Sequence, residues 1–529
     1  MLVYGTAVVC LHATAMLYRF GSIPNIPVFG DEIVINDPAI ALSRGQGLIA
    51  PSFTDSSSGI DKLYAHFPPV YIYLQAAVFR VLGVSGHSLR LLTTIFSIAA
   101  VVAFLLIVYR LCSYGIMKER TGFFVSCLYA LSAPVIILHR ISRMESLVEL
   151  LSLVSLYCAL KLIFGRMDRL FGRMDRPGER TVPERKTQIR LLLVAAISAG
   201  LALASHPEAI NAILPAVLII LFAEHVRTSD KFAFAALLVI TPAAIWIATY
   251  GSQWWIALAQ MAYIAKQKAP DPSMPQFGID LLKKAGSSEH DLMVFLFFSL
   301  TLVVLVWALV QVGRAVIARK REASLADRNL LAIEKALAVA VPVTFVILFF
   351  FLPASITRYE VIYPIYLLLI AVLPVPYTNR PAVRPYVTAG VALLIVGQFL
   401  ACILYLAQNR SSAEGPAERY DFVLNCIPDR DKIAASPQLW LALQTRDRPF
   451  SLLYPGLDGL ESWKKASSNP LGRFDVILLT DYVKDDLTRY APLSGIGKEQ
   501  RDIPIGRRVL RVYSRPGIFA DCKDSRLAH

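Results

Sequence analysis

The sequence has few charged residues for its length. Asp, Glu, Lys and Arg make up 17% of the 529 residues, whereas a soluble domain usually carries about 25%. Hydrophobic residues make up 56% of the chain, and its mean hydropathy is +0.54. This composition excludes a soluble globular protein for most of the chain and indicates a protein embedded in a lipid bilayer.

Negative charge is the scarcer of the two signs. The chain has 53 Lys and Arg against 39 Asp and Glu, a net charge of +14. A basic excess can indicate nucleic-acid binding. Here it lies mainly in short loops between apolar runs, the positive-inside pattern of membrane proteins. We therefore expect a bilayer as partner and no nucleic acid.

Apolar runs recur along the first three-quarters of the chain and end near Ala407. A helical span needs about 20 mostly apolar residues. The sequence predicts about eleven such spans, near residues 2–20, 89–109, 121–138, 146–164, 191–205, 209–223, 232–250, 292–312, 336–352, 361–377 and 387–407. The predicted fold is mainly α: a polytopic membrane helical bundle over 1–409, followed by a soluble domain over 410–529.

The loops between these spans alternate in charge. The loops 110–120, 165–190, 224–231, 313–335 and 378–386 are rich in Arg and Lys, which predicts that they are cytoplasmic. The loops 21–88, 139–145, 206–208, 251–291 and 353–360 are more acidic or mixed, and are predicted outside. The soluble tail then also lies outside. We expect a multi-pass protein of the inner (plasma) membrane with a periplasmic or extracellular C-terminal domain.

The tail contains patterns typical of an α/β domain. "FDVILLTD" (Phe474–Asp481) and "RRVLRVYSRP" favour strands, and "DRDKIAASPQLWLALQTRDRP" favours strand, turn and helix. The tail has no Gly-rich phosphate loop and no cluster of metal ligands. We expect no resident cofactor; a requirement for a divalent metal is left open. Cys426 and Cys522 could form a disulfide in an oxidising compartment or could remain separate thiols.

Ionisable side chains gather in the predicted outer loops. The long loop 21–88 holds Asp31 and Glu32 near its start and Lys62, Tyr64 and His66 further on; shorter turns hold Arg140, Arg143, His206, Glu208, Arg358 and Tyr359. Each alone is compatible with an ordinary solvated or interfacial residue. If the turns converge, carboxylates would meet several guanidinium groups, which bind phosphate through paired N–H donors. This arrangement suits a phosphate-bearing lipid.

Several segments in this order resemble the GT-C membrane glycosyltransferases. They are the Asp31–Glu32 pair followed by "ALSRGQGL", then "HFPPVYIYLQAAVFRVLGVSGHSLRL", "RISRMESLVELLSLVSLY" and "RYEVIYPIYLLLIAVL". The resemblance covers roughly 2–410. It is to protein O-mannosyltransferases, lipid A aminoarabinose transferases and the galacturonosyltransferases of the lipopolysaccharide core.

The resemblance implies transfer of a sugar from a polyprenyl-phosphate donor to an outer-face glycan, lipid or protein, with inversion. It implies that Asp31 is the general base, with Glu32 beside it. Since the pair is expected in an extended segment, only one of the two carboxylates would face the sugar. The candidate phosphate-binding residues are Arg140, Arg143, Arg358, His66 and Lys62, and the candidate walls of the site are Tyr64, His206, Glu208 and Tyr359. Neither the sugar nor the acceptor follows from the sequence.

Two other classes of protein remain open. A transporter or flippase of a lipid-linked substrate would need ionisable groups inside its spans, where Glu149 and Lys161 are among the few present. A membrane sensor would not need the long acidic first loop. Asp31 itself could simply cap a helix near 32–44, because Asp is a preferred N-cap residue.

Overall fold

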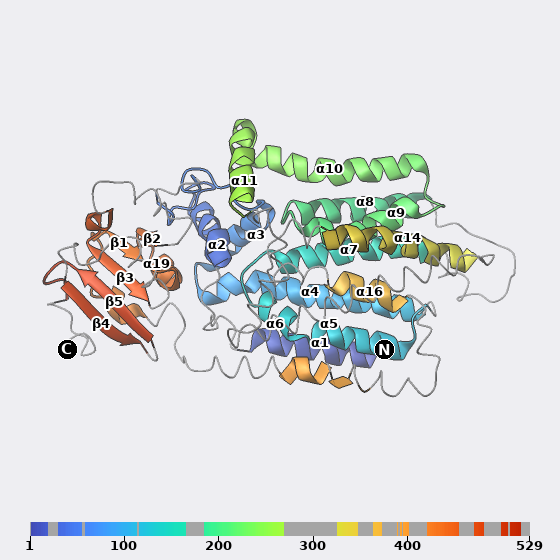
Figure 1. Cartoon of the computed structure of the whole chain (residues 1–529), viewed down its shortest axis with the longest axis horizontal. Helices are drawn as coiled ribbons and strands as arrows, with labels where there is room; N and C mark the ends of the chain where they lie inside the picture. The colour runs from blue at the N-terminus through green and yellow to red at the C-terminus, as the bar shows by residue number, and fades with distance from the viewer. Residues whose placement is uncertain are drawn as a thin grey trace.

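The described residues of the protein are mainly helical, and those near the C-terminus include a β-sheet (Figure 1). The computed structural model describes residues 2–18, 30–54, 59–113, 116–164, 185–268, 325–346, 363–372, 389, 392–393, 395–400, 420–453, 470–480, 499–505 and 508–519. The predicted mainly α architecture is confirmed. The predicted span 292–312 lies outside the described residues.

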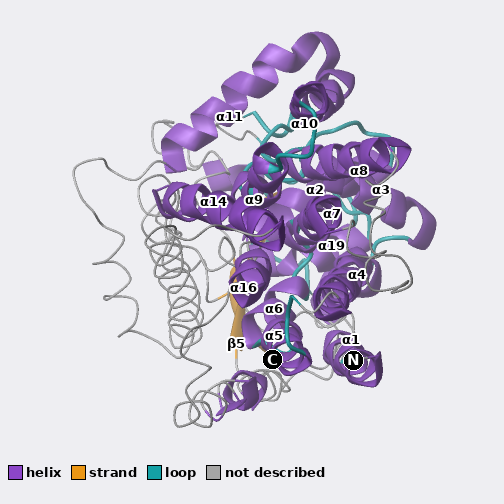
Figure 2. Cartoon of the chain, turned by 90° about the vertical axis from the view of Figure 1, so that its right-hand side faces the viewer, coloured by secondary structure: helices purple, strands orange, loops and turns teal. Residues whose placement is uncertain are grey.

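Most helices run side by side as a bundle (Figures 1 and 2). These helices are α1 (Leu2–Leu17), α4 (Gly86–Ser113), α5 (Glu119–Ala130), α6 (Ala133–His139), α7 (Glu145–Phe164), α8 (Arg185–Leu203), α9 (Ala209–Phe222), α10 (Thr228–Tyr250), α14 (Leu325–Val346) and α16 (Tyr363–Val372). Helix α11 (Trp254–Lys268) follows α10 at an angle. Within the described chain, four helical stretches are long and apolar enough to cross a membrane: Gly86–Ser113, Glu145–Phe164, Arg185–Leu203 and Thr228–Ala262.

Burial separates the centre of the bundle from its rim. Helix α7 packs against α4, α8 and α9, and 72% of its apolar window is buried, against 6% for Thr228–Ala262. A helix that is apolar all round and enclosed belongs to a core. The exposed apolar residues of α10, such as Val239 and Ile247, instead suit contact with lipid.

The predicted span 121–138 is not one helix, and this prediction needs correction. It is divided into α5 and α6, which are separated by Leu131 and Ser132. The physical reason is Pro134, which lies in the first turn of α6. Proline lacks the N–H that a continuous helix would require there, yet suits the first turn of a new one.

The predicted outer loop 21–88 contains two helices, α2 (Gly30–Ser43) and α3 (Val70–Leu82). Asp31 and Glu32 are therefore helical, and the expectation of an extended segment was wrong. Helix α2 begins before Asp31, at Gly30. Helix α3 has 13 residues, fewer than the roughly 20 that a span requires.

The tail folds around a five-stranded mixed sheet with strand order β2-β1-β3-β5-β4. The strands are β1 (Ile433–Ala435), β2 (Phe450–Leu452), β3 (Val476–Thr480), β4 (Glu499–Ile505) and β5 (Arg508–Ser514). Strand β1 pairs in parallel with β2 and β3, whereas β5 pairs antiparallel with β3 and β4. Short helices α18 (Asp421–Leu424) and α19 (Trp440–Thr445) accompany it. The segments predicted as strands at Phe474–Asp481 and "RRVLRVYSRP" contain β3 and β5.

The tail docks on the first outer loop through the buried carboxylate of Asp37 on α2. This carboxylate accepts hydrogen bonds from Trp440 Nε1 at 2.9 Å and Gln444 Nε2 at 2.7 Å. It also accepts them from the hydroxyl and backbone N–H of Ser52, at 2.6 and 3.0 Å. The predicted topology, in which α2 and the tail lie on the same side of the membrane, is compatible with this contact.

Cys426 is disulfide-bonded. Cys522 lies outside the described residues, so their pairing with each other stays a prediction.

Burial raises the pKa of Asp37, and the hydrogen bonds from Ser52, Trp440 and Gln444 oppose that rise. All four donors suit an ionised carboxylate, which only accepts hydrogen bonds. We predict that Asp37→Asn weakens the docking of the tail, because the new amide would direct N–H groups at existing donors. A hydrogen bond to a charged group contributes about 1.5–3 kcal/mol.

Limited proteolysis and thermal unfolding in detergent would measure this loss. Asp421→Asn is the matched control, since Asp421 pairs with Arg446 within the tail. Equal stability of the Asp37 and Asp421 variants would show that the carboxylate at 37 does not hold the tail.

Candidate functional site

The centre of the candidate site is the turn between α6 and α7, residues 140–144. Connecting segments usually run over the surface, where water satisfies their backbone. Here all five residues are buried, and Ser142 is 0% exposed. A buried turn needs protein partners for its polar groups, and helices α2 and α3 supply them.

Ser142 uses its backbone and its side chain to join the turn to these helices. Its N–H donates to Glu32 Oε1 at 3.0 Å, and its C=O accepts from Asn36 Nδ2 at 3.0 Å. Its hydroxyl donates to Asn36 Oδ1 at 3.1 Å and lies 3.2 Å from the Tyr71 hydroxyl. We call this set of contacts the Ser142 joint; it fixes α2 beside the turn.

Glu32 is the charged member of the joint. Its side chain is 2% exposed, and its Oε1 lies 3.7 Å from Arg90 Nη2 on α4, itself 3% exposed. A buried carboxylate is stable only when it is paired and hydrogen-bonded. The Ser142 N–H and Arg90 meet both conditions, so Glu32 anchors α2 to the bundle.

Tyr71 adds a neutral donor to the joint. Burial is the main cause that raises the pKa of this phenol, and the nearby Glu32 and Glu145 carboxylates raise it further. Tyr71 therefore stays protonated at neutral pH and can donate to the Ser142 hydroxyl.

The turn also carries two of the predicted phosphate-binding residues. Arg143 Nη2 lies 2.5 Å from Glu145 Oε1. Arg140 Nη1 donates to the Ala15 carbonyl at 2.7 Å, in the last turn of α1, where the helix dipole favours a cation. With Arg90, three buried guanidinium groups stand against the carboxylates of Glu32 and Glu145. Paired N–H donors of such guanidinium groups suit an anionic headgroup.

A second group of predicted residues lies along the segment 62–67. The rings of Tyr64, His66, Phe67 and His206 form a row of contacts, with centroids 6.4, 4.7 and 6.1 Å apart. Tyr250 Oη donates to the Tyr64 carbonyl at 3.1 Å, and Gln260 Oε1 accepts from the Ala65 N–H at 2.5 Å. The structure thus brings Tyr64, His66 and His206 together.

The other predicted residues are placed as follows. Lys62 is exposed, and Glu208 is half-buried, where its backbone N–H donates to His206 Nδ1 at 3.0 Å. Asp31 lies in the first turn of α2. Arg358 and Tyr359 lie outside the described residues. Sequence reasoning did not single out Asn36, Tyr71, Arg90 and Ser142 as site residues. Tyr71, Arg90 and Ser142 lie in segments that carry the GT-C resemblance, and Arg90 is also a charge just inside the predicted span 89–109.

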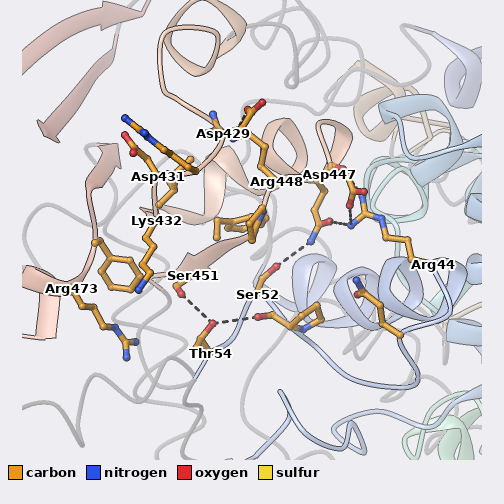
Figure 3. Close-up of a pocket in the computed structure, with 18 residues that line it drawn as sticks. Arg44, Ser52, Thr54, Asp429, Asp431, Lys432, Asp447, Arg448, Ser451 and Arg473 are labelled. Carbon is orange, nitrogen blue, oxygen red and sulfur yellow. Dashed lines mark hydrogen bonds and ion pairs between the residues drawn. The ribbon is translucent and has the colours of Figure 1, made fainter. Parts of the chain in front are cut away.

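A cavity of about 640 Å³ lies between residues 44–54 of the first outer loop and the tail (Figure 3). Its lining includes the cations Arg44, Arg430, Lys432, Arg448 and Arg473 and the acids Asp429, Asp431 and Asp447. Each acid is within 4 Å of a guanidinium group: Asp447 of Arg44 at 3.0 Å, Asp429 of Arg448 at 3.6 Å and Asp431 of Arg515 at 2.7 Å. Because the lining has more cationic than acidic side chains, its net charge is positive. Within the described part of the chain, no three metal-binding side chains converge.

Comparison with solved structures defines the fold. ArnT from Cupriavidus metallidurans, bound to undecaprenyl phosphate, matches over 97% of both chains at 12% identity with a TM-score of 0.50. The oligosaccharyltransferase of Archaeoglobus fulgidus matches over 98% of this chain and 74% of its own, at 12% identity and a TM-score of 0.52. AglB of the same organism, in complex with an inhibitory peptide and a dolichol-phosphate, matches over 97% of this chain and 74% of its own. The identity is 13% and the TM-score is 0.51.

No family model and no curated protein sequence matches the chain. The structural likeness nevertheless spans nearly the whole chain. The protein therefore has a GT-C-like fold, the fold of a class of membrane glycosyltransferases, and the resemblance found in the sequence is confirmed at this level.

Proposed function

We propose that the protein is a membrane glycosyltransferase that moves a sugar from a polyprenyl-phosphate donor to an acceptor on the outer face, with inversion. The observation that supports this most is the Ser142 joint. It holds a carboxylate-bearing helix beside a turn with two buried arginines. The fold is that of structures that hold undecaprenyl phosphate and a dolichol-phosphate.

The proposed chemistry needs a base and a cationic site for the leaving group. An acceptor hydroxyl becomes a good nucleophile when a carboxylate takes its proton. Its oxygen then bonds to the anomeric carbon, whose bond to the donor phosphate oxygen breaks. The electron pair leaves with the phosphate, which cations stabilise. We assign the cations to Arg140 and Arg143, with Arg358, His66 and Lys62 as further members.

The two adjacent acids receive different roles. Glu32 is already engaged by Ser142 and Arg90, so we assign it to positioning. Asp31, one residue earlier on α2, is the proposed base.

We predict that Asp31→Asn lowers turnover by about 10²–10⁴-fold, the usual contribution of general-base catalysis. The amide keeps the shape of the side chain but cannot take the proton, so binding of the donor should persist. Transfer from a purified polyprenyl-phosphate sugar and donor binding would be measured on the same sample.

Asp230→Asn, in the first turn of α10, is the control for removal of an acid. Near-wild-type transfer by Asp31→Asn would exclude the proposed base and favour a structural role for this residue. A transporter is separated by the same assay, because it would move the intact donor without releasing polyprenyl phosphate.

We further propose that the cavity between the first outer loop and the tail receives an anionic part of the acceptor. Figure 3 shows Lys432, Arg473, Ser451 and Thr54 gathered at one side of it. Ser451 Oγ donates to Thr54 Oγ1 at 3.1 Å, which links the two walls. Hydroxyls beside cations suit phosphate or carboxylate groups on a glycan or lipid.

Lys432→Ala should raise the acceptor concentration needed for half-maximal transfer several-fold and leave the donor requirement unchanged. The measurement titrates an extract of outer-face glycans and lipids into a transfer assay. Arg446→Ala is the control, since Arg446 pairs with Asp421 and does not itself line the cavity. An unchanged acceptor requirement in the Lys432 variant would remove the cavity from acceptor binding.

A further inference from the structure

A chain of polar side chains crosses the interior of the helical bundle. It consists of His12 on α1, Ser97 on α4, Tyr129 on α5, His139 at the end of α6 and Glu149 on α7. All five are buried, and none exceeds 1% exposure. Ionisable groups inside a membrane bundle are costly unless they pair with one another. The contacts among these five side chains therefore limit which protonation states they can adopt.

The contacts form one continuous line. His12 Nδ1 lies 2.7 Å from the Ala130 carbonyl, and His12 Nε2 lies 2.8 Å from Ser97 Oγ. Ser97 Oγ lies 2.8 Å from His139 Nδ1, and His139 Nε2 lies 3.0 Å from Glu149 Oε2. The Tyr129 hydroxyl donates to Glu149 Oε1.

The first contact determines the rest. A carbonyl only accepts, so His12 Nδ1 must carry a proton. If His12 is neutral, its Nε2 accepts from the Ser97 hydroxyl, whose oxygen then accepts from His139 Nδ1–H. In that arrangement His139 Nε2 lies 3.0 Å from Glu149 Oε2, a distance that fits an ion pair but not the geometry of a hydrogen bond. This ion pair forms when the ring carries one further proton.

The same count holds if the extra proton sits on His12 instead. Then His12 donates to Ser97, Ser97 donates to His139, and the protonated Nε2 of His139 lies beside an ionised Glu149. In both arrangements the line holds one proton more than two neutral imidazoles and one carboxylate. Without that proton, the buried carboxylate of Glu149 has no cationic partner in His139.

We propose that these five residues form a one-proton relay that positions the 140–144 turn for glycosyl transfer. His139 immediately precedes the turn, and Glu149 lies one helical turn after Glu145, so the relay holds the turn from both sides. Its members are positioning residues: they act through the Ser142 joint and the turn arginines. This inference rests on the proposed function for its consequence, but its structural effect is measurable separately.

Glu149→Gln and Glu149→Leu provide the test. Gln can donate its N–H to His139 Nε2 and accept from Tyr129, so it satisfies the line without a mobile proton. Leu has a similar volume but offers neither. An unsatisfied buried polar group costs about 1–3 kcal/mol, equivalent to about ten- to a hundredfold in an equilibrium.

Two quantities are measured for each variant: the rate of sugar transfer at saturating donor, and deuterium exchange at the backbone amides of 139–146. We expect Glu149→Gln to match the wild type in both. We expect Glu149→Leu to lower the rate at saturating donor by about ten- to a hundredfold, with donor affinity retained, and to speed exchange at the turn.

Loss of transfer by Glu149→Gln with normal exchange would overturn the proposal and favour proton conduction. Wild-type behaviour of Glu149→Leu in both measurements would also overturn it. If Glu149→Leu does not fold, Ser97→Ala interrupts the line at its centre and should show the same faster exchange. Protected amides in the wild type and Gln variant without any sugar transfer would leave the relay intact and exclude the proposed function.

Discussion

The burial of Ser142 is the constraint on which the site depends. A connecting turn at 0% exposure has no access to water, and an unmade hydrogen bond there costs about 1–3 kcal/mol. Glu32, Asn36 and Tyr71 supply the missing partners. The bundle and helix α2 therefore cannot separate without exposing these groups or leaving them without partners, so α2 acts as one unit with the turn.

Three buried polar connections extend this unit in different directions. Arg90 joins Glu32 to α4. Asp37, five residues after Glu32, joins the other end of α2 to the tail through Trp440 and Gln444. The relay from His12 to Glu149 reaches the turn through His139, the residue that precedes it. Each connection pairs a charged or ionisable group with partners inside the protein. The same contacts therefore satisfy the buried polar groups and hold the site rigid.

The sequence predicted features that depend on local pattern. Apolar runs predicted the helices of the bundle, and short β-branched runs predicted strands β3 and β5. The GT-C resemblance also came from segments in order along the chain. A helix near 32–44 entered only as the alternative in which Asp31 is its cap, whereas the main interpretation made the Asp31–Glu32 pair extended. Ile33, Val34, Ile35 and Pro38 have low helix propensity, so the local pattern did not decide between the two.

Features that depend on distant partners could not be predicted in this way. Asn36 and Ser142 are 106 residues apart in sequence, and His12 and Ala130 are 118 apart. Nothing in either local pattern indicates its partner. The break between α5 and α6 had a local signal, Pro134, which the continuous hydropathy of 121–138 concealed. Apolar periodicity reports burial but not which polar groups meet inside.

The central claim is that the Ser142 joint is one cooperative connection required for glycosyl transfer. A double-mutant cycle on the transfer rate with Asn36→Ala and Ser142→Ala tests it most directly. Contacting residues typically show a coupling of about 0.5–3 kcal/mol. We predict a coupling in this range, with each single variant slower and the double variant little worse than either. Additive losses, or wild-type rates in both single variants, would contradict the account.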